Sequence, residues 1–268
     1  MKAKAILALL LGLLTLACEE TIDLPLRSEN LNLLVVEGIL TNEKLNHKIT
    51  LSHPYSKQNG DAAPASGAVV KITDGVNNIS LTEFPIGSGE YYTPPIRAVF
   101  GKIYTLTIQY QGKDYFAQDS PVPVEPLQSL DYRKVDELYS LNLSETGQDA
   151  SFTNHDISWK NTSLCVLGDV CQGEVVFYDL KTIDVNEIYK PAKSDFKFPL
   201  NSIVVRKKYS ISPAYKIFLR SVLSETEWRG GVFDVQRADA TTNLSGGAIG
   251  FFAVSTVVSD STVVVAKP

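Results

Sequence analysis

The sequence predicts a mainly β protein in two parts, an antiparallel sandwich followed by a second β-rich module that contains one amphipathic helix. Short apolar stretches with period-two alternation recur between clusters of Gly, Asn, Asp and Pro, as in β-sandwiches. Residues 120–126 contain three prolines, which marks a stiff connector between the two parts. A clear helical period occurs after Ser212-Pro213.

The first domain, residues 32–119, is predicted from a series of short strands. In the strand at 102–110, Tyr104 and Tyr110 share one face with two aliphatic residues, so this face is expected to pack in the core. The other strands of this domain are expected at residues 33–40, 47–53, 67–73, 79–84, 90–91 and 115–117.

The order of glycines and strands in this domain resembles the prealbumin-like and carboxypeptidase-regulatory-like β-sandwich. The resemblance is carried by Gly67 to Ile72, Gly89-Glu90-Tyr91, Gly101 to Ile108 and Asp114 to Ala117. In those modules glycines mark the turns and a Tyr-x-Leu-x-Ile strand fills the core. Because immunoglobulin-like folds share much of this pattern, the resemblance implies an immunoglobulin/prealbumin-like antiparallel sandwich.

The second domain, residues 127–268, is predicted to hold further strands around a helix at about 213–228. Ser212 suits the N-cap and Pro213 suits the first helical position, while Gly230-Gly231 is expected to end the helix. The stretches at 137–150 and 182–199 are expected to be loops. Strands are expected at residues 130–135, 156–159, 173–180, 203–209, 232–235, 250–258 and 262–266.

Residues 1–17 have the parts of a secretory signal: Lys2 and Lys4, then an apolar run that is too short to span a bilayer. The Leu-Thr-Leu-Ala that precedes Cys18 resembles the lipobox of bacterial lipoproteins, although Thr15 stands where Leu is usual. In those proteins the cysteine is diacylated before cleavage in front of it. We predict lipidation of Cys18, with an ordinary signal peptide as the alternative.

Residues 18–31 are polar and are expected to form a lipidated tether. Glu19, Glu20 and Asp23 resemble the surface-export signal of Bacteroidetes lipoproteins. A solvated tether with chance charges is the alternative. We expect lipid anchoring in the bacterial outer membrane and favour the cell-surface face over the periplasmic face.

The charge of the chain excludes some classes of partner. Lys2 and Lys4 are the basic residues that precede Cys18, so 23 basic and 30 acidic residues follow and the net charge is about −7. Nucleic acid and anionic lipid both attract basic surfaces, so neither is an expected electrostatic partner. Because no membrane-spanning apolar run follows Cys18, the lipid on Cys18 is the expected membrane attachment.

Cys165 and Cys171 are disulfide candidates, because an exported chain meets an oxidising compartment. A three-residue hairpin loop over Leu167–Asp169 would place the two cysteines opposite each other, at the separation that a disulfide needs. A two-residue loop would break that register and leave two thiols. A metal pair is the weakest alternative, because nothing nearby completes a zinc site.

Three histidines limit the options for catalysis and metal binding. His47 and His53 would share a strand face about 20 Å apart, too far to share a metal. His155 and Asp156 are strand neighbours that point to opposite faces. The sequence lacks a Gly-x-Ser-x-Gly elbow, a His-Glu-x-x-His motif, a phosphate loop and a complete calcium loop. We predict no catalytic residue, no metal site and no cofactor; a triad assembled across the fold remains the alternative.

Tyr91 and Tyr92, next to Pro94-Pro95, are the candidate surface patch for a ligand or partner. Adjacent aromatic rings offer apolar faces to sugars or peptides. We therefore predict these two tyrosines as the contact surface for a small-molecule or peptide ligand.

The C-terminal stretch 242–252, Thr-Asn-Leu-Ser-Gly-Gly-Ala-Ile-Gly-Phe-Phe, follows a helix that begins with Ser-Pro. Together with Leu-Val-Val-Glu-Gly at 34–38 behind a lipobox, it resembles the Bacteroidetes outer-membrane lipoproteins known as domain of unknown function 4249. Such proteins tend to be encoded beside TonB-dependent receptors. The resemblance implies a non-enzymatic accessory or ligand-binding subunit of an uptake receptor. The alternatives are a surface structural or adhesive module and a hydrolase whose site lies between the modules.

Overall fold

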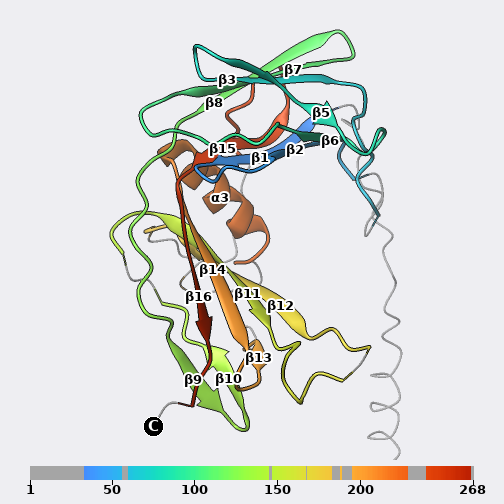
Figure 1. The fold of residues 1–268 in the computed structure, drawn as a ribbon. Helices are drawn as coiled ribbons and strands as arrows, with labels where there is room; N and C mark the ends of the chain where they lie inside the picture. The colour runs from blue at the N-terminus through green and yellow to red at the C-terminus, as the bar shows by residue number, and fades with distance from the viewer. Residues whose placement is uncertain are drawn as a thin grey trace, which may run out of the picture.

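The computed structural model describes most of the chain after the predicted tether. A β-sandwich lies at one end, helix α3 (Pro213–Glu225) lies beneath it, and two further sheets lie at the other end (Figure 1). The predicted signal peptide, Cys18, the Gly230-Gly231 helix stop and the strand at 232–235 lie outside the described residues. The described residues are 33–55, 60–144, 147–166, 168–182, 188, 195–228 and 240–266.

The sandwich has two layers. The five-stranded sheet has the order β15-β1-β2-β6-β5, and the opposite layer has the order β4-β3-β7-β8. Strands of the five-stranded sheet are β1 (Val35–Thr41), β2 (Lys48–Ser52), β5 (Thr82–Glu83), β6 (Glu90–Tyr92) and β15 (Ile249–Ser255). Strands of the opposite layer are β3 (Val69–Thr73), β4 (Asn78–Ser80), β7 (Tyr104–Tyr110) and β8 (Lys113–Asp119).

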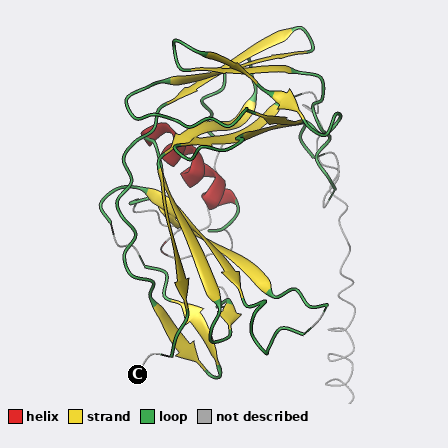
Figure 2. Ribbon diagram, viewed as in Figure 1, coloured by secondary structure: helices red, strands yellow, loops and turns green. Residues whose placement is uncertain are grey.

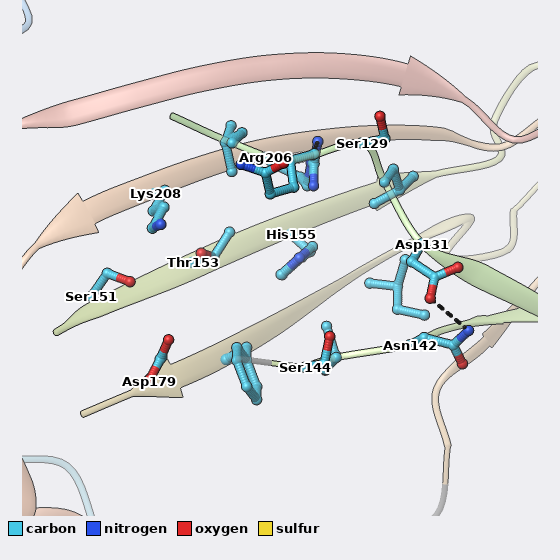
Figure 3. Close-up of a pocket in the computed structure, with 16 residues that line it drawn as sticks. Ser129, Asp131, Asn142, Ser144, Ser151, Thr153, His155, Asp179, Arg206 and Lys208 are labelled. Carbon is cyan, nitrogen blue, oxygen red and sulfur yellow. Dashed lines mark hydrogen bonds between the residues drawn. The ribbon is translucent and has the colours of Figure 1, made fainter. Parts of the chain in front are cut away.

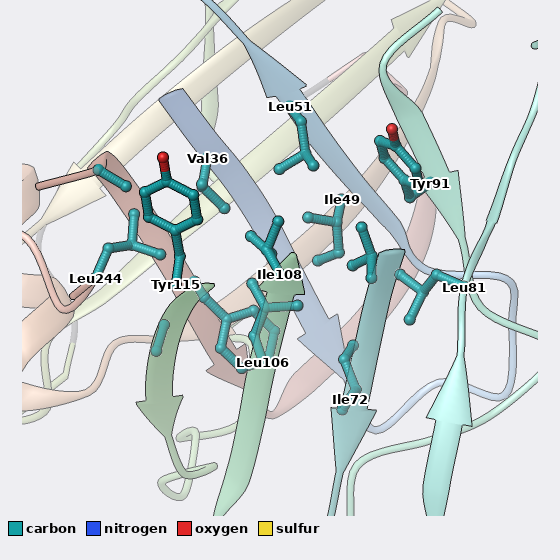
Figure 4. Close-up of a cluster of buried hydrophobic side chains, with 14 of the residues drawn as sticks. Val36, Ile49, Leu51, Ile72, Leu81, Tyr91, Leu106, Ile108, Tyr115 and Leu244 are labelled. Atoms are coloured by element: carbon teal, nitrogen blue, oxygen red, sulfur yellow. The ribbon is translucent and has the colours of Figure 1, made fainter. Parts of the chain in front are cut away.

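Alternation along the strands builds the sandwich core, as the sequence predicts. On β7, Tyr104, Leu106 and Ile108 are buried, and the ring of Tyr110 packs at the edge of the same cluster. Side chains from the two layers meet face to face (Figure 4). The fully buried members from the two layers include Val36, Leu40, Ile49, Leu51, Ile72, Leu106, Ile108 and Phe252.

β15 completes the sandwich from the far end of the chain. It pairs in parallel with β1, and its Phe252 and Val254 are buried in the sandwich core. Gly250 has a φ of 97°, and a Cβ there would lie 2.1 Å from the Val36 carbonyl oxygen, so this pairing requires glycine. The predicted boundary that assigns all of 127–268 to a second domain is therefore wrong for β15.

The long sheet is the main layer of the second part and has the order β12-β11-β14-β16. The chain leaves β15, passes Thr256 and enters β16 in this sheet, so one extended segment crosses from the sandwich to the long sheet (Figure 1). The predicted single strand at 250–258 is therefore divided between two sheets. The strands are β11 (Ser151–Ser158), β12 (Gln172–Asp179), β14 (Ile203–Ser210) and β16 (Val257–Val263).

A small sheet with the order β13-β10-β9 packs against one end of the long sheet. Its strands β10 and β13 lie in the stretches predicted as loops at 137–150 and 182–199. The β9–β10 turn contains Asp136 at a φ of 57° and lacks the glycine that marks most such turns. The sequence pattern therefore does not predict this hairpin. The strands are β9 (Tyr132–Val135), β10 (Leu138–Leu141) and β13 (Lys197–Phe198).

Helix α3 begins where the sequence predicts. The Ser212 hydroxyl accepts a hydrogen bond from the Tyr215 amide, and Pro213 occupies the first turn. Tyr215 and Phe218 pack against Phe251 of β15, at ring-centroid distances of 4.9 and 5.2 Å. The helix therefore covers the outer face of the five-stranded sheet, between the sandwich and the long sheet (Figure 2).

Candidate functional site

One face of the long sheet is apolar at one end and polar at the other. Alternate residues of β11 and β14 point to this face, and at its lower end Ile157 and Val204 are buried against Tyr139 and Phe198 of the small sheet. At its upper end the same alternation presents polar and charged side chains. These side chains are Ser151, Thr153, His155, Asp179, Arg206 and Lys208.

These polar side chains line a cavity of about 80 Å³ (Figure 3). Strand register places Lys208 opposite Thr153 and Arg206 opposite His155. Two segments that run across the sheet, residues 127–131 and 141–144, complete the lining. The second segment continues from β10, so the small sheet positions this side of the cavity.

Asn142 joins these two segments. Its side-chain amide donates to the Asp131 carboxylate at 3.1 Å, and its main-chain amide donates to the Asp131 carbonyl at 3.0 Å. Hydrogen bonds between the segments 127–131 and 141–144 therefore hold both segments in place beside the cavity.

Arg206 joins the segment 127–131 to the long sheet. Its guanidinium donates twice to the Asp260 carboxylate of β16, with Nε 2.9 Å from Oδ1, and donates once to the Gln128 carbonyl at 2.7 Å. Such a bidentate ion pair is strong and directional. The charge of Arg206 is therefore balanced within the protein, and its role is to hold the cavity in shape.

Lys208 is placed differently. Its side chain is 8 % exposed, and among the described residues its ammonium makes no hydrogen bond and pairs with the Glu125 carboxylate only at 3.9 Å. Both Glu125 oxygens accept hydrogen bonds from the Gln148 amide instead, at 2.9 and 3.0 Å. Lys208 thus presents a weakly compensated positive charge to the cavity.

His155 is buried and neutral. Its Nδ1 donates to the Val175 carbonyl at 3.1 Å, which leaves Nε2 as the acceptor of the neutral ring. Burial lowers the pKa of His155, so the ring stays uncharged near neutral pH. Asp156 points to the opposite, exposed face, as alternation along the strand predicts.

Asp179 lines the cavity from the last position of β12, opposite Ser151. Its carboxylate pairs with the Lys181 ammonium at 2.6 Å, and the Asp179 side chain is 8 % exposed. Its negative charge is therefore offset by a lysine outside the cavity lining.

The predicted tyrosine patch is wrong for Tyr91. Tyr91 is fully buried in the sandwich; its hydroxyl donates to the Ala65 carbonyl and accepts from the Ala68 amide. Neighbouring residues on a strand face opposite sides, so Tyr92 points outward and donates to Glu90 at 2.7 Å. Tyr92 lines a shallow depression beside Phe84, away from the cavity on the long sheet.

The predicted disulfide between Cys165 and Cys171 is present, with the two Cα atoms 5.6 Å apart. Among the described residues the ladder of β11 and β12 ends at Ser158 with Gln172, so the strand pairing expected around the bridge is absent there. The bridge lies beyond that pair, within the connection between these strands. It fixes a loop at the edge of the long sheet and lies outside the lining of the cavity.

The other histidines lie at opposite ends of β2. His47 is buried with its Nε2 3.0 Å from the Thr41 hydroxyl, and His53 contacts the Leu33 carbonyl and the Tyr110 hydroxyl. In the part of the chain that the structure describes, no three metal-ligating side chains cluster. The described residues also contain no helix that is long and apolar enough to cross a membrane.

The model of the family described as Domain of unknown function (DUF4249) matches residues 19–261. The chain belongs to this family. The DUF4249 match includes β1, β15 and most of β16, so the sandwich and the long sheet are parts of one family unit. A comparison with curated proteins finds no match.

The sequence pattern predicts a strand at 203–209 but does not identify Arg206 and Lys208 as residues of a site. Arg206 and Lys208 stand two and four residues after Val204 on β14, so their side chains point to the same face of the strand as Val204, which is buried. Charged residues on the buried face of a strand need partners of opposite charge. Two such residues next to an apolar one on the same face therefore indicate a polar site. Which residues lie opposite them depends on strand order, which the sequence does not reveal.

Proposed function

We propose that this protein is a lipid-anchored, non-enzymatic subunit of the bacterial outer membrane, which binds a ligand or a receptor barrel and assists TonB-dependent uptake. The observation that carries the proposal is the cavity on the long sheet, whose side chains are arranged for binding. Arg206 is held by Asp260 and Gln128, and the Nδ1 of His155 is held by a main-chain carbonyl. Side chains that the protein's own hydrogen bonds hold in place are preorganised, which favours the binding of a small polar ligand.

The membrane attachment is proposed at Cys18. The apolar run and the Leu-Thr-Leu-Ala in front of this cysteine support it. Each buried methylene of an acyl chain contributes about 0.8 kcal/mol, so more than one chain makes the attachment stable. The acidic residues that follow Cys18 support display on the cell surface.

Metabolic labelling with a palmitate analogue tests the anchor. The wild-type protein should carry the label and stay with the membrane fraction, whereas Cys18→Ser should lose both. Cys165→Ser is the matched control, because it removes a cysteine and leaves Cys18 in place. A labelled Cys18→Ser protein would contradict the proposed anchor.

Affinity purification from native membranes tests the partner. A TonB-dependent receptor should be recovered with the wild-type protein after gentle detergent extraction. Repeated recovery of the lipoprotein alone, at yields that would reveal an equimolar partner, would count against the accessory role. Protease treatment of intact cells should degrade the protein if it is on the surface.

A hydrolase is the second candidate, because His155, Ser151 and Asp179 line the same cavity. Ser151 and Asp179 face each other across β11 and β12, whereas His155 stands four residues from Ser151 along β11, about 13 Å away. A catalytic triad needs a serine on one imidazole nitrogen and a carboxylate on the other. The Nδ1 of His155 donates to a main-chain carbonyl, and Asp179 pairs with Lys181, so the cavity favours binding over this chemistry.

A fluorophosphonate probe separates the two candidates. Under the leading proposal no serine should be labelled at concentrations that label a serine hydrolase. Covalent labelling that is lost in Ser151→Ala and kept in Ser221→Ala, where a half-buried serine of α3 outside the cavity lining is replaced, would favour the hydrolase.

A further inference from the structure

We propose that the cavity on the long sheet binds a small carboxylate, with the Lys208 ammonium as its counter-charge. This inference rests on the geometry of the cavity and does not depend on the anchor or on the uptake partner. The ligand class is a hydroxy acid of two or three carbons, or the matching end of a longer molecule, because the cavity measures about 80 Å³.

The charges around the cavity identify Lys208 as the contact for an anion. Arg206 is balanced by Asp260 through two hydrogen bonds, and Asp179 is balanced by Lys181 at 2.6 Å. Among the described residues, Lys208 is the cation of the lining that has no hydrogen bond. Its ammonium has three donors and lies in a buried position, where a carboxylate offers acceptors and the opposite charge.

Glu125 does not fill this role. Its carboxylate lies 3.9 Å from the Lys208 ammonium, beyond hydrogen-bonding distance, and both of its oxygens accept from the Gln148 amide. The Glu125 charge offsets part of the charge of Lys208 at longer range. The ammonium of Lys208, which lines the cavity, therefore has donors that no described residue uses.

The surrounding groups favour a hydroxy acid over a plain carboxylate. Thr153 lies directly opposite Lys208 and provides a hydroxyl beside the bound carboxylate. His155 is the next residue of that strand face, so it is a diagonal neighbour of Lys208, about 7–8 Å away between Cα atoms. Its Nε2 accepts hydrogen bonds, so it suits a hydroxyl on the carbon next to the carboxylate. A molecule of the size of glycolate or lactate spans these groups.

Thermal unfolding in glycolate tests the proposal. The wild-type midpoint should rise with the logarithm of the glycolate concentration, by about 3 to 6 °C at ten times the dissociation constant. Lys208→Met should lose the rise. Lys71→Met, which removes an exposed lysine from a strand of the sandwich, should keep it. Glycolamide, which has the same shape without the charge, should give a much smaller rise.

Two results would overturn the proposal: an undiminished glycolate effect in Lys208→Met, or an equal effect of glycolamide on the wild-type protein. If Lys208→Met does not fold, the imidazole NMR signals of the unsubstituted protein decide the question. Glycolate should shift the signal of His155 and leave His47 and His53, which lie in the sandwich, unchanged. Equal shifts of all three signals, or none, would rule the site out.

Discussion

His47 shows how a single buried side chain affects the whole protein. It is 2 % exposed, and the Thr41 hydroxyl lies 3.0 Å from its Nε2. Burial lowers the pKa of His47 from 6.5 to about 4, and nearby Glu43 partly opposes this change. The unfolded chain therefore binds a proton at a pH where the folded protein does not, and the stability of the fold depends on pH.

The free energy of unfolding should fall as the pH decreases from 6.5 toward 4. The unfolded state binds more protons in this interval, so His47 alone should lower the free energy of unfolding by about 2–3 kcal/mol between pH 7 and pH 4.5. Urea unfolding at both values measures it. In His47→Gln the difference between the two pH values should be smaller by that amount. Equal differences in both proteins would contradict the assignment.

At the scale of elements, α3 depends on its first turn. The Ser212 side chain caps the Tyr215 amide, and its hydroxyl lies close enough to the Asp119 carboxylate, at the point where β8 leaves the sandwich, to favour the charged form of that group. Asp119 in turn accepts from the Val254 amide of β15 at 2.8 Å, and burial raises the pKa of Asp119. One polar contact thus joins the helix to two strands of the sandwich.

Ser212→Ala should lower the free energy of unfolding by about 1 kcal/mol, because the hydrogen bond that caps the Tyr215 amide is lost. Ser212→Thr is the matched control, since it keeps a hydroxyl that can cap. Urea unfolding at pH 7 measures both variants. If alanine and threonine give the same stability, the hydroxyl is not the reason for the serine.

At the scale of the whole molecule, a strand from near the end of the chain pairs with the first strand of the fold. β15 fills the edge of the five-stranded sheet beside β1, and β16 continues from it into the long sheet. The Lys207 ammonium of β14 reaches Glu43 of the sandwich at 2.9 Å. The two parts therefore share a strand segment, a helix and an ion pair, so they are expected to unfold together.

Residues 33–122 alone should fail to fold, because the core loses Phe252 and Val254 and β1 becomes an open edge. The same fragment joined to residues 240–256 by a short Gly/Ser linker should regain a dispersed amide NMR spectrum. The linker can be short, because the side-chain amide of Asn243 lies 3.0 Å from the Gln118 carbonyl. Cooperative unfolding of the shorter fragment would show that β15 is dispensable.

Much of the fold is local and could be predicted. Alternation on β7 and β14, the Ser-Pro start of α3 and the disulfide pair all depend on residues close together in the sequence. β10 was missed because its turn, at Asp136, lacks glycine. Tyr91 was misplaced because two adjacent tyrosines suggest one patch, whereas strand geometry turns them to opposite sides.

The sequence by itself determined the β character of the chain, its capped helix, its acidic composition and the predicted anchor, because periodicity, capping and composition are local properties. Only the tertiary structure decided that β15 belongs to the sandwich and that Lys208, Thr153 and His155 surround one cavity. Strand order and register join residues far apart in the chain, and their free energy depends on packing that no local pattern encodes.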